Sequence, residues 1–358
     1  MMTPRLEQLL RESREVTLVG YYGVNNFGDD LMLRSILDKL EPLHLKLNLV
    51  SYGEAIPWIS PAITVYRWSR GRRFRNIRMF LQAVSSSSLV LWGGGTCFTD
   101  EDGDGLFRPM MLALLSGKPI AYVGVGIGNL TSWSRRARTV ALLNASCYVS
   151  FRDERSYRQG RSWTLFHKDK VERIDDPAHE LLRTYSPPVG DPPRKSRTLV
   201  LAWRNLEKYG ATTLGNRLTP VVDLCLRLAR QHGIERIEIL NADSSYDEKC
   251  GRKLYDLLAG YAHRMEVTYC TARYFEDKLK ILAAAEVVVT SRLHVGAAAY
   301  FLNITCYMYN YSPKIAIFMG EFGAEAMMML EDKGDGELQV SAPQGDNSHK
   351  RGTEHTHG

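Results

Sequence analysis

Apolar and polar positions are grouped in blocks along the chain. Short apolar runs rich in valine, isoleucine and tyrosine have the length of strands, and the segments between them have a helical period. The runs lie at residues 16–23, 45–53, 88–95, 119–128, 147–154, 198–205, 236–243, 265–270, 286–294 and 303–310. Near-continuous apolar strands separated by helices are typical of parallel sheets covered on both faces. The pattern therefore predicts an α/β fold.

The segment after the first apolar run shows the helical period clearly. Its apolar residues share one helix face, and they are Leu33, Ile36, Leu37 and Leu40. Asp29 or Asp30 comes just before them and is the candidate for the helix cap.

A proline-rich stretch divides the two sets of apolar runs. Residues 185–197, "YSPPVGDPPRKSR", cannot continue a helix or a strand and are predicted to be a linker. We expect two doubly wound, Rossmann-like domains that face each other across a cleft, at residues 1–184 and 198–333. Residues 334–358 are polar and are expected to be a disordered tail.

The composition is that of a soluble globular protein, with 44% hydrophobic and 24% charged residues. The chain has no apolar run of about 18 residues that would span a membrane, and its first residues lack the apolar stretch of a secretory signal. The scattered cysteines form no CxxC pair, so a zinc or redox motif is not indicated. We expect a cytoplasmic protein without a metal site.

The net charge is +6 at pH 7, and part of it lies in "YRWSRGRRFRNIR". The arginines from Arg67 to Arg78 suit an anionic surface such as phospholipid, which would place the protein at the inner face of the membrane. A solvated helix face is the alternative interpretation. No helix-turn-helix, zinc finger or ribonucleoprotein motif accompanies the charge, so we expect no nucleic acid partner.

Glycine-rich turns follow two strands. In open α/β sheets, ligands bind outside the carboxyl ends of the strands. "GYYGVNNFGDD" follows the first strand and brings Asn26, Gly28 and Asp29 to that edge, and "LWGGGTCFTD" brings Gly94 and Gly95. These glycines let the backbone approach a ligand closely, or they serve the turn alone. Neither segment is a Walker loop or a dinucleotide fingerprint.

Arginines end three of the strands. "SFRDERS" carries Arg152 and Asp153, "AWRN" carries Arg204, and "SRLH" carries Arg292 and His294. One such arginine is as well explained by a structural ion pair, but three at one edge indicate a ligand with several negative charges. A histidine beside them adds a group that can transfer a proton near neutral pH, unless it is a satisfied core histidine.

The ordered set of motifs resembles the polysaccharide pyruvyl transferases. The matching segments are "GYYGVNNFGDD", "WGGGTCFTD", "VGVGIG", "SFRDERS", "DDPAHEL", "SRLHVGAAAYFLNI" and "YNYSPKIAIFMGEFG". The resemblance implies a GT-B-like pair of domains. It also implies transfer of a pyruvyl group from phosphoenolpyruvate to two hydroxyls of a sugar, as a ketal. The sugar would belong to a cell-surface or exported polysaccharide or to its lipid-linked precursor, and no cofactor would be needed.

The resemblance also implies roles for the candidate residues. Arg292 and His294 would hold the carboxylate and phosphate of phosphoenolpyruvate, with Leu293 offering its backbone. Arg152 and Arg204 would add positive charge, and Lys314 a further anion contact. We assign the base near the acceptor to Asp29, with Asp30 and Asp153 as rivals, and the acid to His294 if it is not a phosphate ligand. The first domain would hold the acceptor and the second the donor.

Two other functions stay open. The same two domains could form a nucleotide-sugar glycosyltransferase, although the second domain lacks the paired glutamates of many such enzymes. A binding protein for an anionic sugar, without turnover, is the other alternative, because function is set by the site and not by the fold.

Overall fold

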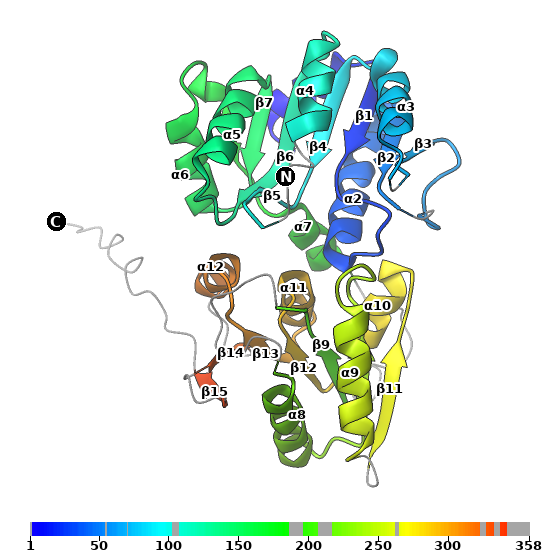
Figure 1. The fold of residues 1–358 in the computed structure, drawn as a ribbon, viewed down its shortest axis with the longest axis vertical. Helices are drawn as coiled ribbons and strands as arrows, with labels where there is room; N and C mark the ends of the chain where they lie inside the picture. The colour runs from blue at the N-terminus through cyan, green and yellow to red at the C-terminus, as the bar shows by residue number, and fades with distance from the viewer. Residues whose placement is uncertain are drawn as a thin grey trace, which may run out of the picture.

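The computed structural model describes residues 2–53, 56–69, 71–101, 107–185, 196–206, 217–261, 265–322, 327–332 and 337–341. Two α/β units lie one above the other in Figure 1, each built on its own sheet. Among the described residues, the first sheet ends at Arg173 and the second begins at Thr198. Residues 186–195 of the predicted linker lie outside the described residues.

The first sheet is parallel and has the strand order β3-β2-β1-β4-β6-β7-β8, with β5 paired to β6. Its strands are β1 (Glu15–Val19), β2 (Lys46–Ser51), β3 (Thr64–Arg67), β4 (Leu89–Gly93), β5 (Thr96–Phe98), β6 (Ile120–Ile127), β7 (Tyr148–Phe151) and β8 (Val171–Arg173). The helices are α1 (Pro4–Arg11), α2 (Phe27–Leu40), α3 (Arg73–Ser85), α4 (Phe107–Leu115), α5 (Trp133–Ala145), α6 (Glu154–Trp163) and α7 (Pro177–Thr184), with 3-10 turns η1 (Glu41–Leu43) and η2 (Lys168–Lys170).

The second sheet has the order β11-β10-β9-β12-β13-β14-β15 and is parallel except for its last pair. Its strands are β9 (Thr198–Ala202), β10 (Arg236–Leu240), β11 (Glu266–Cys270), β12 (Val287–Thr290), β13 (Thr305–Tyr309), β14 (Met327–Asp332) and β15 (Leu338–Ser341). The helices are α8 (Thr219–His232), α9 (Glu248–Ala259), α10 (Phe275–Ala283), α11 (Leu293–Phe301) and α12 (Pro313–Phe322). Both orders reverse beside the first strand of the sheet, as in doubly wound folds.

The predicted α/β fold is confirmed, and each of the predicted apolar runs contains a strand of one of the two sheets. The strands that the pattern missed are β3, β5, β8, β14 and β15, most of which are short or lie at a sheet edge. One expectation was wrong, because β15 pairs with β14 at residues 338–341, where we expected the disordered tail. Residues 342–358 lie outside the described part of the chain.

The cap of α2 is also corrected. The cap residue is Asn26, whose Oδ1 accepts hydrogen bonds from the backbone N–H groups of Gly28 and Asp29, at 3.1 and 3.5 Å. Asp29 and Asp30 instead occupy the first turn, where a negative charge is favoured by the helix dipole.

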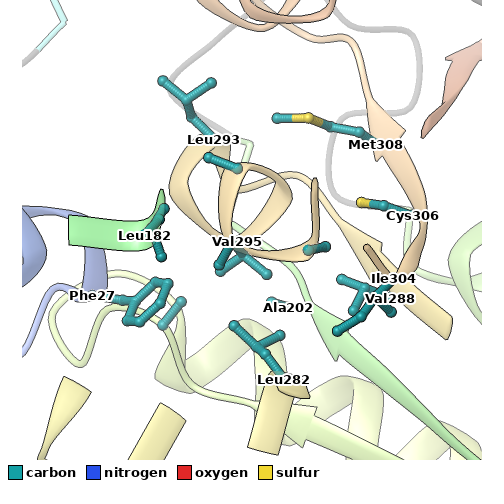
Figure 2. Packing of buried hydrophobic residues seen from close by; sticks show 14 of the residues in the cluster. Phe27, Leu182, Ala202, Leu282, Val288, Leu293, Val295, Ile304, Cys306 and Met308 are labelled. Carbon is teal, nitrogen blue, oxygen red and sulfur yellow. The ribbon is translucent and has the colours of Figure 1, made fainter. Parts of the chain in front are cut away.

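The two domains share one hydrophobic cluster. Figure 2 shows Phe27 and Leu182, from the first domain, beside Val295 and Leu282 from the second. Leu182 is 1% exposed, and the small residues of α11, which include Ala297, are fully buried in the same cluster. These small residues let α2 and α7 pack closely against α11, so the apolar contact helps to fix the relative position of the domains.

We predict that Leu182→Ala lowers the free energy of unfolding by about 2–5 kcal/mol, because it opens a cavity in this shared cluster. Urea unfolding followed by tryptophan fluorescence measures the change. Leu115→Ala is the matched control, because Leu115 is 79% exposed and such surface changes stay within about 0.5 kcal/mol. Equal stability of the two variants would show that the shared cluster does not support the fold.

Candidate functional site

The loops after the strands of both sheets enclose a cavity of about 250 Å³ between the domains. Eleven of the thirteen candidate residues line it, and they are Asn26, Gly28, Asp29, Gly94, Gly95, Arg152, Arg204, Arg292, Leu293, His294 and Lys314. These residues therefore do lie together at the sheet edges that the strand ends predicted. Of the other two, Asp30 is buried in the first turn of α2 and does not line this cavity.

Asp153 lies elsewhere. It caps α6, and its carboxylate accepts hydrogen bonds from the Ser156 backbone N–H and hydroxyl, each at 2.7 Å. It lines a smaller adjoining cavity of about 70 Å³. Arg152 and Lys314 line both cavities, so the two spaces are neighbours. The helix-cap role occupies Asp153, whereas Asp29 lines the larger cavity beside the arginines.

A buried ion cluster joins the domains at the wall of the larger cavity. Arg152 Nη1 donates to Asp176 Oδ2 at 2.6 Å, and His294 Nε2 lies 3.3 Å from the same oxygen. Asp176 is 4% exposed and caps α7, whereas His294 comes from α11 of the other domain. Burial alone would raise the pKa of Asp176, but Arg152 and His294 hold that pKa well below its ordinary value. The carboxylate is therefore ionised at neutral pH.

Glycine is required where the His294 ring meets α2. A Cβ atom on Gly28 would lie 2.0 Å from His294 Nδ1, a distance that the ring cannot tolerate. The imidazole is thus held between the backbone of α2 on one side and the Asp176 carboxylate on the other. This placement fixes its orientation and leaves its edge at the cavity.

Arg292 is engaged by two aspartates that sequence reasoning missed. Its guanidinium pairs with Asp247 and, at 3.3 Å from Nη1 to Oδ2, with Asp243. Burial lowers the pKa of Arg292, but the two carboxylates outweigh this effect and raise it, so the charge is kept. Among the described residues, no group accepts a hydrogen bond from the buried Nε–H. The Nε–H of Arg292 is therefore a buried donor that a ligand oxygen would satisfy.

Asn26 connects the same aspartates to the first domain. Its Nδ2 donates to Asp243 Oδ2 at 3.1 Å, and the backbone N–H of Phe27 donates to the Ala242 carbonyl at 2.8 Å. Asn26, which we predicted to bind substrate, thus caps α2 and bridges the domains while it lines the cavity.

The glycine loop after β4 faces Asp29. Gly94 and Gly95 have φ angles of 71° and 83°, which favour glycine. A Cβ atom on Gly95 would lie 3.5 Å from Asp29 Oδ1, so the bare backbone leaves room at this carboxylate. Burial first, and then the charges of Asp243 and Asp30, raise the pKa of Asp29 well above its ordinary value. The raised pKa makes this carboxyl group a candidate for proton transfer.

The opposite wall carries Arg204, Tyr311 and Lys314. The backbone N–H of Arg204 donates to Ser291 Oγ at 2.7 Å, and its Nη1 donates to the Tyr311 hydroxyl at 3.2 Å. Lys314 Nζ lies 5.9 Å from the centre of the Tyr311 ring. Tyr311 was not among our candidate site residues, although it follows a strand end as Arg204 and Arg292 do.

The missed partners had one sequence signal in common. Asp243 and Asp247 follow β10, and Asp176 follows β8, so all three come after strands at the same sheet edges as the predicted residues. Within the described ranges, no group of three or more His, Cys, Asp or Glu residues is placed to hold a metal ion. Nor does any helix in those ranges combine the length and apolar character needed to cross a bilayer.

The family model for polysaccharide pyruvyl transferase matches residues 26–313. The match covers most of the chain and every candidate residue except Lys314, and the protein belongs to this family. No curated protein matches the chain in sequence.

Solved structures share the two-domain, GT-B-like fold. A UDP-GlcNAc 2-epimerase from Methanocaldococcus jannaschii matches with a TM-score of 0.57 at 12% identity, over 93% of this chain and 96% of that one. The MnaA protein of S. aureus, solved with UDP, has a TM-score of 0.59 at 12% identity, over 86% and 83%. The UDP-N-acetylglucosamine 2-epimerase of Rickettsia bellii has a TM-score of 0.56 at 13% identity, over 84% and 80%. At these identities the likeness concerns the fold alone.

We predict that Asp176→Asn lowers the free energy of unfolding by about 3–5 kcal/mol at pH 7, because it leaves the buried Arg152 without its counter-ion. The pKa of Asp176 is lowered in the folded protein, so its stabilising effect is complete above pH about 4 and is lost as the pH falls further. Urea unfolding of both proteins from pH 7 to pH 3 should therefore show their stabilities converging in acid.

Asp175→Asn is the control for that series. Asp175 pairs with Arg183 at 2.7 Å, but its side chain is 57% exposed, and an exposed pair contributes about 1 kcal/mol or less. If Asp176→Asn lowers the free energy of unfolding no more than Asp175→Asn does, the buried ion cluster does not link the two domains structurally.

Proposed function

We propose that the protein transfers a pyruvyl group from phosphoenolpyruvate to two hydroxyls of a sugar and forms a cyclic ketal. The observation that carries the proposal is the composition of one cavity wall, where His294, Arg204, Arg292 and Lys314 converge in a chain of this family. Phosphoenolpyruvate has a carboxylate and a phosphate, and guanidinium groups bind both by paired hydrogen bonds. The free Nε–H of Arg292 suits one of these oxygens.

The reaction needs a proton donor, a base and positive charge. A proton must be added to C3 so that C2 becomes electrophilic, and a sugar hydroxyl then bonds to C2 as it loses its own proton. The C2–O bond to phosphate breaks, and the second hydroxyl closes the ketal. Arg204 and Lys314 would stabilise the phosphate, since preorganised charges lower the barrier most where charge develops. Asp29, on the facing wall, is the base that we propose for the acceptor hydroxyl.

The smaller cavity suits the sugar. It is lined by polar side chains that include Asn129, Asp153 and Glu321. His179 and Ser312 also line it, and the buried atoms His179 Nε2 and Ser312 Oγ have no hydrogen-bond partner among the described residues. Buried polar atoms without partners are costly, and sugar hydroxyls would satisfy them. Arg152, shared by both cavities, would then lie between acceptor and donor.

We predict that phosphoenolpyruvate binds the wild type in calorimetry and that Lys314→Ala weakens binding about tenfold or more, as loss of a charged hydrogen bond implies. Lys314 is the better first variant, because removing Arg292 would strand Asp243 and Asp247 as buried unpaired charges. Arg252→Ala is the control, since Arg252 is 59% exposed in a surface pair with Glu248. Binding of UDP-GlcNAc with no binding of phosphoenolpyruvate would instead favour a nucleotide-sugar enzyme, a ligand class seen in the fold relatives.

We also propose that the basic segment meets an anionic membrane surface, from which a lipid-linked acceptor would reach the site at the cytoplasmic face. Arg67, Arg72, Arg73, Arg75 and Arg78 are exposed. Phe74 is 87% exposed beside them; Arg70 lies outside the described residues. Trp68, at the base of the segment, stacks on Tyr52 with ring centres 5.3 Å apart, and Tyr52 lines the large cavity. Arginines with an exposed aromatic ring suit a membrane interface.

We predict that the wild type sediments with phosphatidylglycerol vesicles and not with phosphatidylcholine vesicles. The double variant Arg73→Glu/Arg75→Glu should weaken binding at least about tenfold, because each basic residue contributes about 1 kcal/mol near an anionic surface. Arg158→Glu/Arg161→Glu makes the same charge change on exposed α6 and should bind as the wild type does. Equal loss in both double variants would show a general charge effect and contradict a specific surface.

A further inference from the structure

Tyr311 occupies a particular place in the cavity. It lies just after β13, on the wall that belongs to the second domain, and its hydroxyl accepts a hydrogen bond from Arg204 Nη1 at 3.2 Å. Lys314 lies at 5.9 Å from its ring centre, and the ring stacks on Tyr309 with centres 6.4 Å apart. The ring is thus fixed by packing, and its hydroxyl is set among cations.

The surrounding charges make this phenol a better acid than an ordinary tyrosine. Burial raises the pKa of Tyr311, but Lys314, Arg204 and Arg292 together outweigh burial and lower the pKa below its usual value. The same cations would stabilise the phenolate that remains once the proton has left. Tyr21 and Tyr52 also line the cavity, but burial raises the pKa of each.

Several other acidic groups in or beside the cavity are less suited to donate. Asp176 is ionised and holds Arg152 and His294. Asp243 and Asp247 hold Arg292. The Cys97 thiol lines the cavity, but burial raises its pKa well above the usual value. Asp29 has a carboxyl group that can exchange protons, but it lies on the first-domain wall beside Gly95 and is the residue that we propose as the base.

We propose that the Tyr311 hydroxyl is the acid that protonates C3 of phosphoenolpyruvate. This inference rests on the proposed function and names the proton donor that the function requires. Acid and base would then stand on opposite domains, Tyr311 on the donor side and Asp29 on the acceptor side, so that the step needs the domains in contact.

The proton balance closes with these two residues. Tyr311 gives one proton to C3, the electron pair of the C2–C3 double bond forms the new C3–H bond, and C2 accepts the first sugar oxygen. The bond from C2 to the phosphate oxygen then breaks, and the second sugar oxygen bonds to C2. The two sugar hydroxyls release two protons through Asp29. One returns to the Tyr311 phenolate, and the other leaves with phosphate.

The test is Tyr311→Phe, which removes the hydroxyl and keeps the ring. Phosphate release is measured from phosphoenolpyruvate with a mixture of methyl hexopyranosides as the hydroxyl source, and phosphoenolpyruvate binding is measured by calorimetry. We expect kcat to fall by at least about 100-fold, as for loss of a general acid, while the Kd for phosphoenolpyruvate changes by less than about threefold. Tyr255→Phe, on the exposed face of α9, is the matched control.

A second readout needs no turnover. Tyrosinate absorbance followed against pH should show an early-titrating tyrosine in the wild type and in Tyr255→Phe that is missing in Tyr311→Phe. Phosphoenolpyruvate should move that transition to higher pH, because added negative charge at the cations disfavours the phenolate.

The outcomes separate the two claims. If Tyr311→Phe keeps kcat within about threefold of the wild type, or loses kcat only in proportion to lost phosphoenolpyruvate binding, Tyr311 is not the acid and the proposed function stands. If the wild type neither binds phosphoenolpyruvate nor releases phosphate, the proposed function fails and the role of Tyr311 fails with it. An unchanged absorbance titration in Tyr311→Phe also overturns the inference.

Discussion

The carboxylate of Asp176 is the point on which the arrangement of the site depends. It is buried at the start of α7 and faces two nitrogen groups, Arg152 from its own domain and His294 from the other. A buried anion is tolerated only when such partners compensate its lost hydration. Moving the domains apart would separate His294 from Asp176, so the ion cluster and the domain arrangement stabilise each other.

Apolar packing between the two domains supports this ion cluster. The cluster that contains Phe27 and Leu182 includes Leu282 and Val295 of the second domain (Figure 2). Val295 belongs to α11, which carries His294 in its first turn. Because α11 is lined with alanine and glycine, α2 and α7 approach it closely, and the absent side chain of Gly28 makes room for the imidazole. Hydrophobic burial thus brings the domains together, and the polar contacts determine how the side chains at the cavity wall are oriented.

The two walls of the cavity have different chemistry. The second domain contributes most of the cations, whereas the first contributes bare glycine backbone and the Asp29 carboxyl group. By charge, the wall of the second domain suits an anionic ligand, whereas the wall of the first domain leaves space beside the Asp29 carboxyl group. Under the proposed function, the second domain would hold the donor and the first domain the acceptor, at the junction between the domains.

The alternation of apolar runs and helical segments by itself determined the fold class, the principal strands and the sheet edge at which the site would form. It did so because strand burial and helix amphipathicity are local properties of the chain. The pattern did not predict the short strands β5 and β8 or the edge strand β15, because their pairing and not their apolar pattern makes them strands. Only the tertiary structure decided which side chains pair. His294 and Asp176 lie 118 residues apart, and no local period encodes that contact. The same holds for Asp243 and Asp247 with Arg292, and for the place of Tyr311 beside Arg204, because these contacts form only when two separately wound sheets bring their strand ends together.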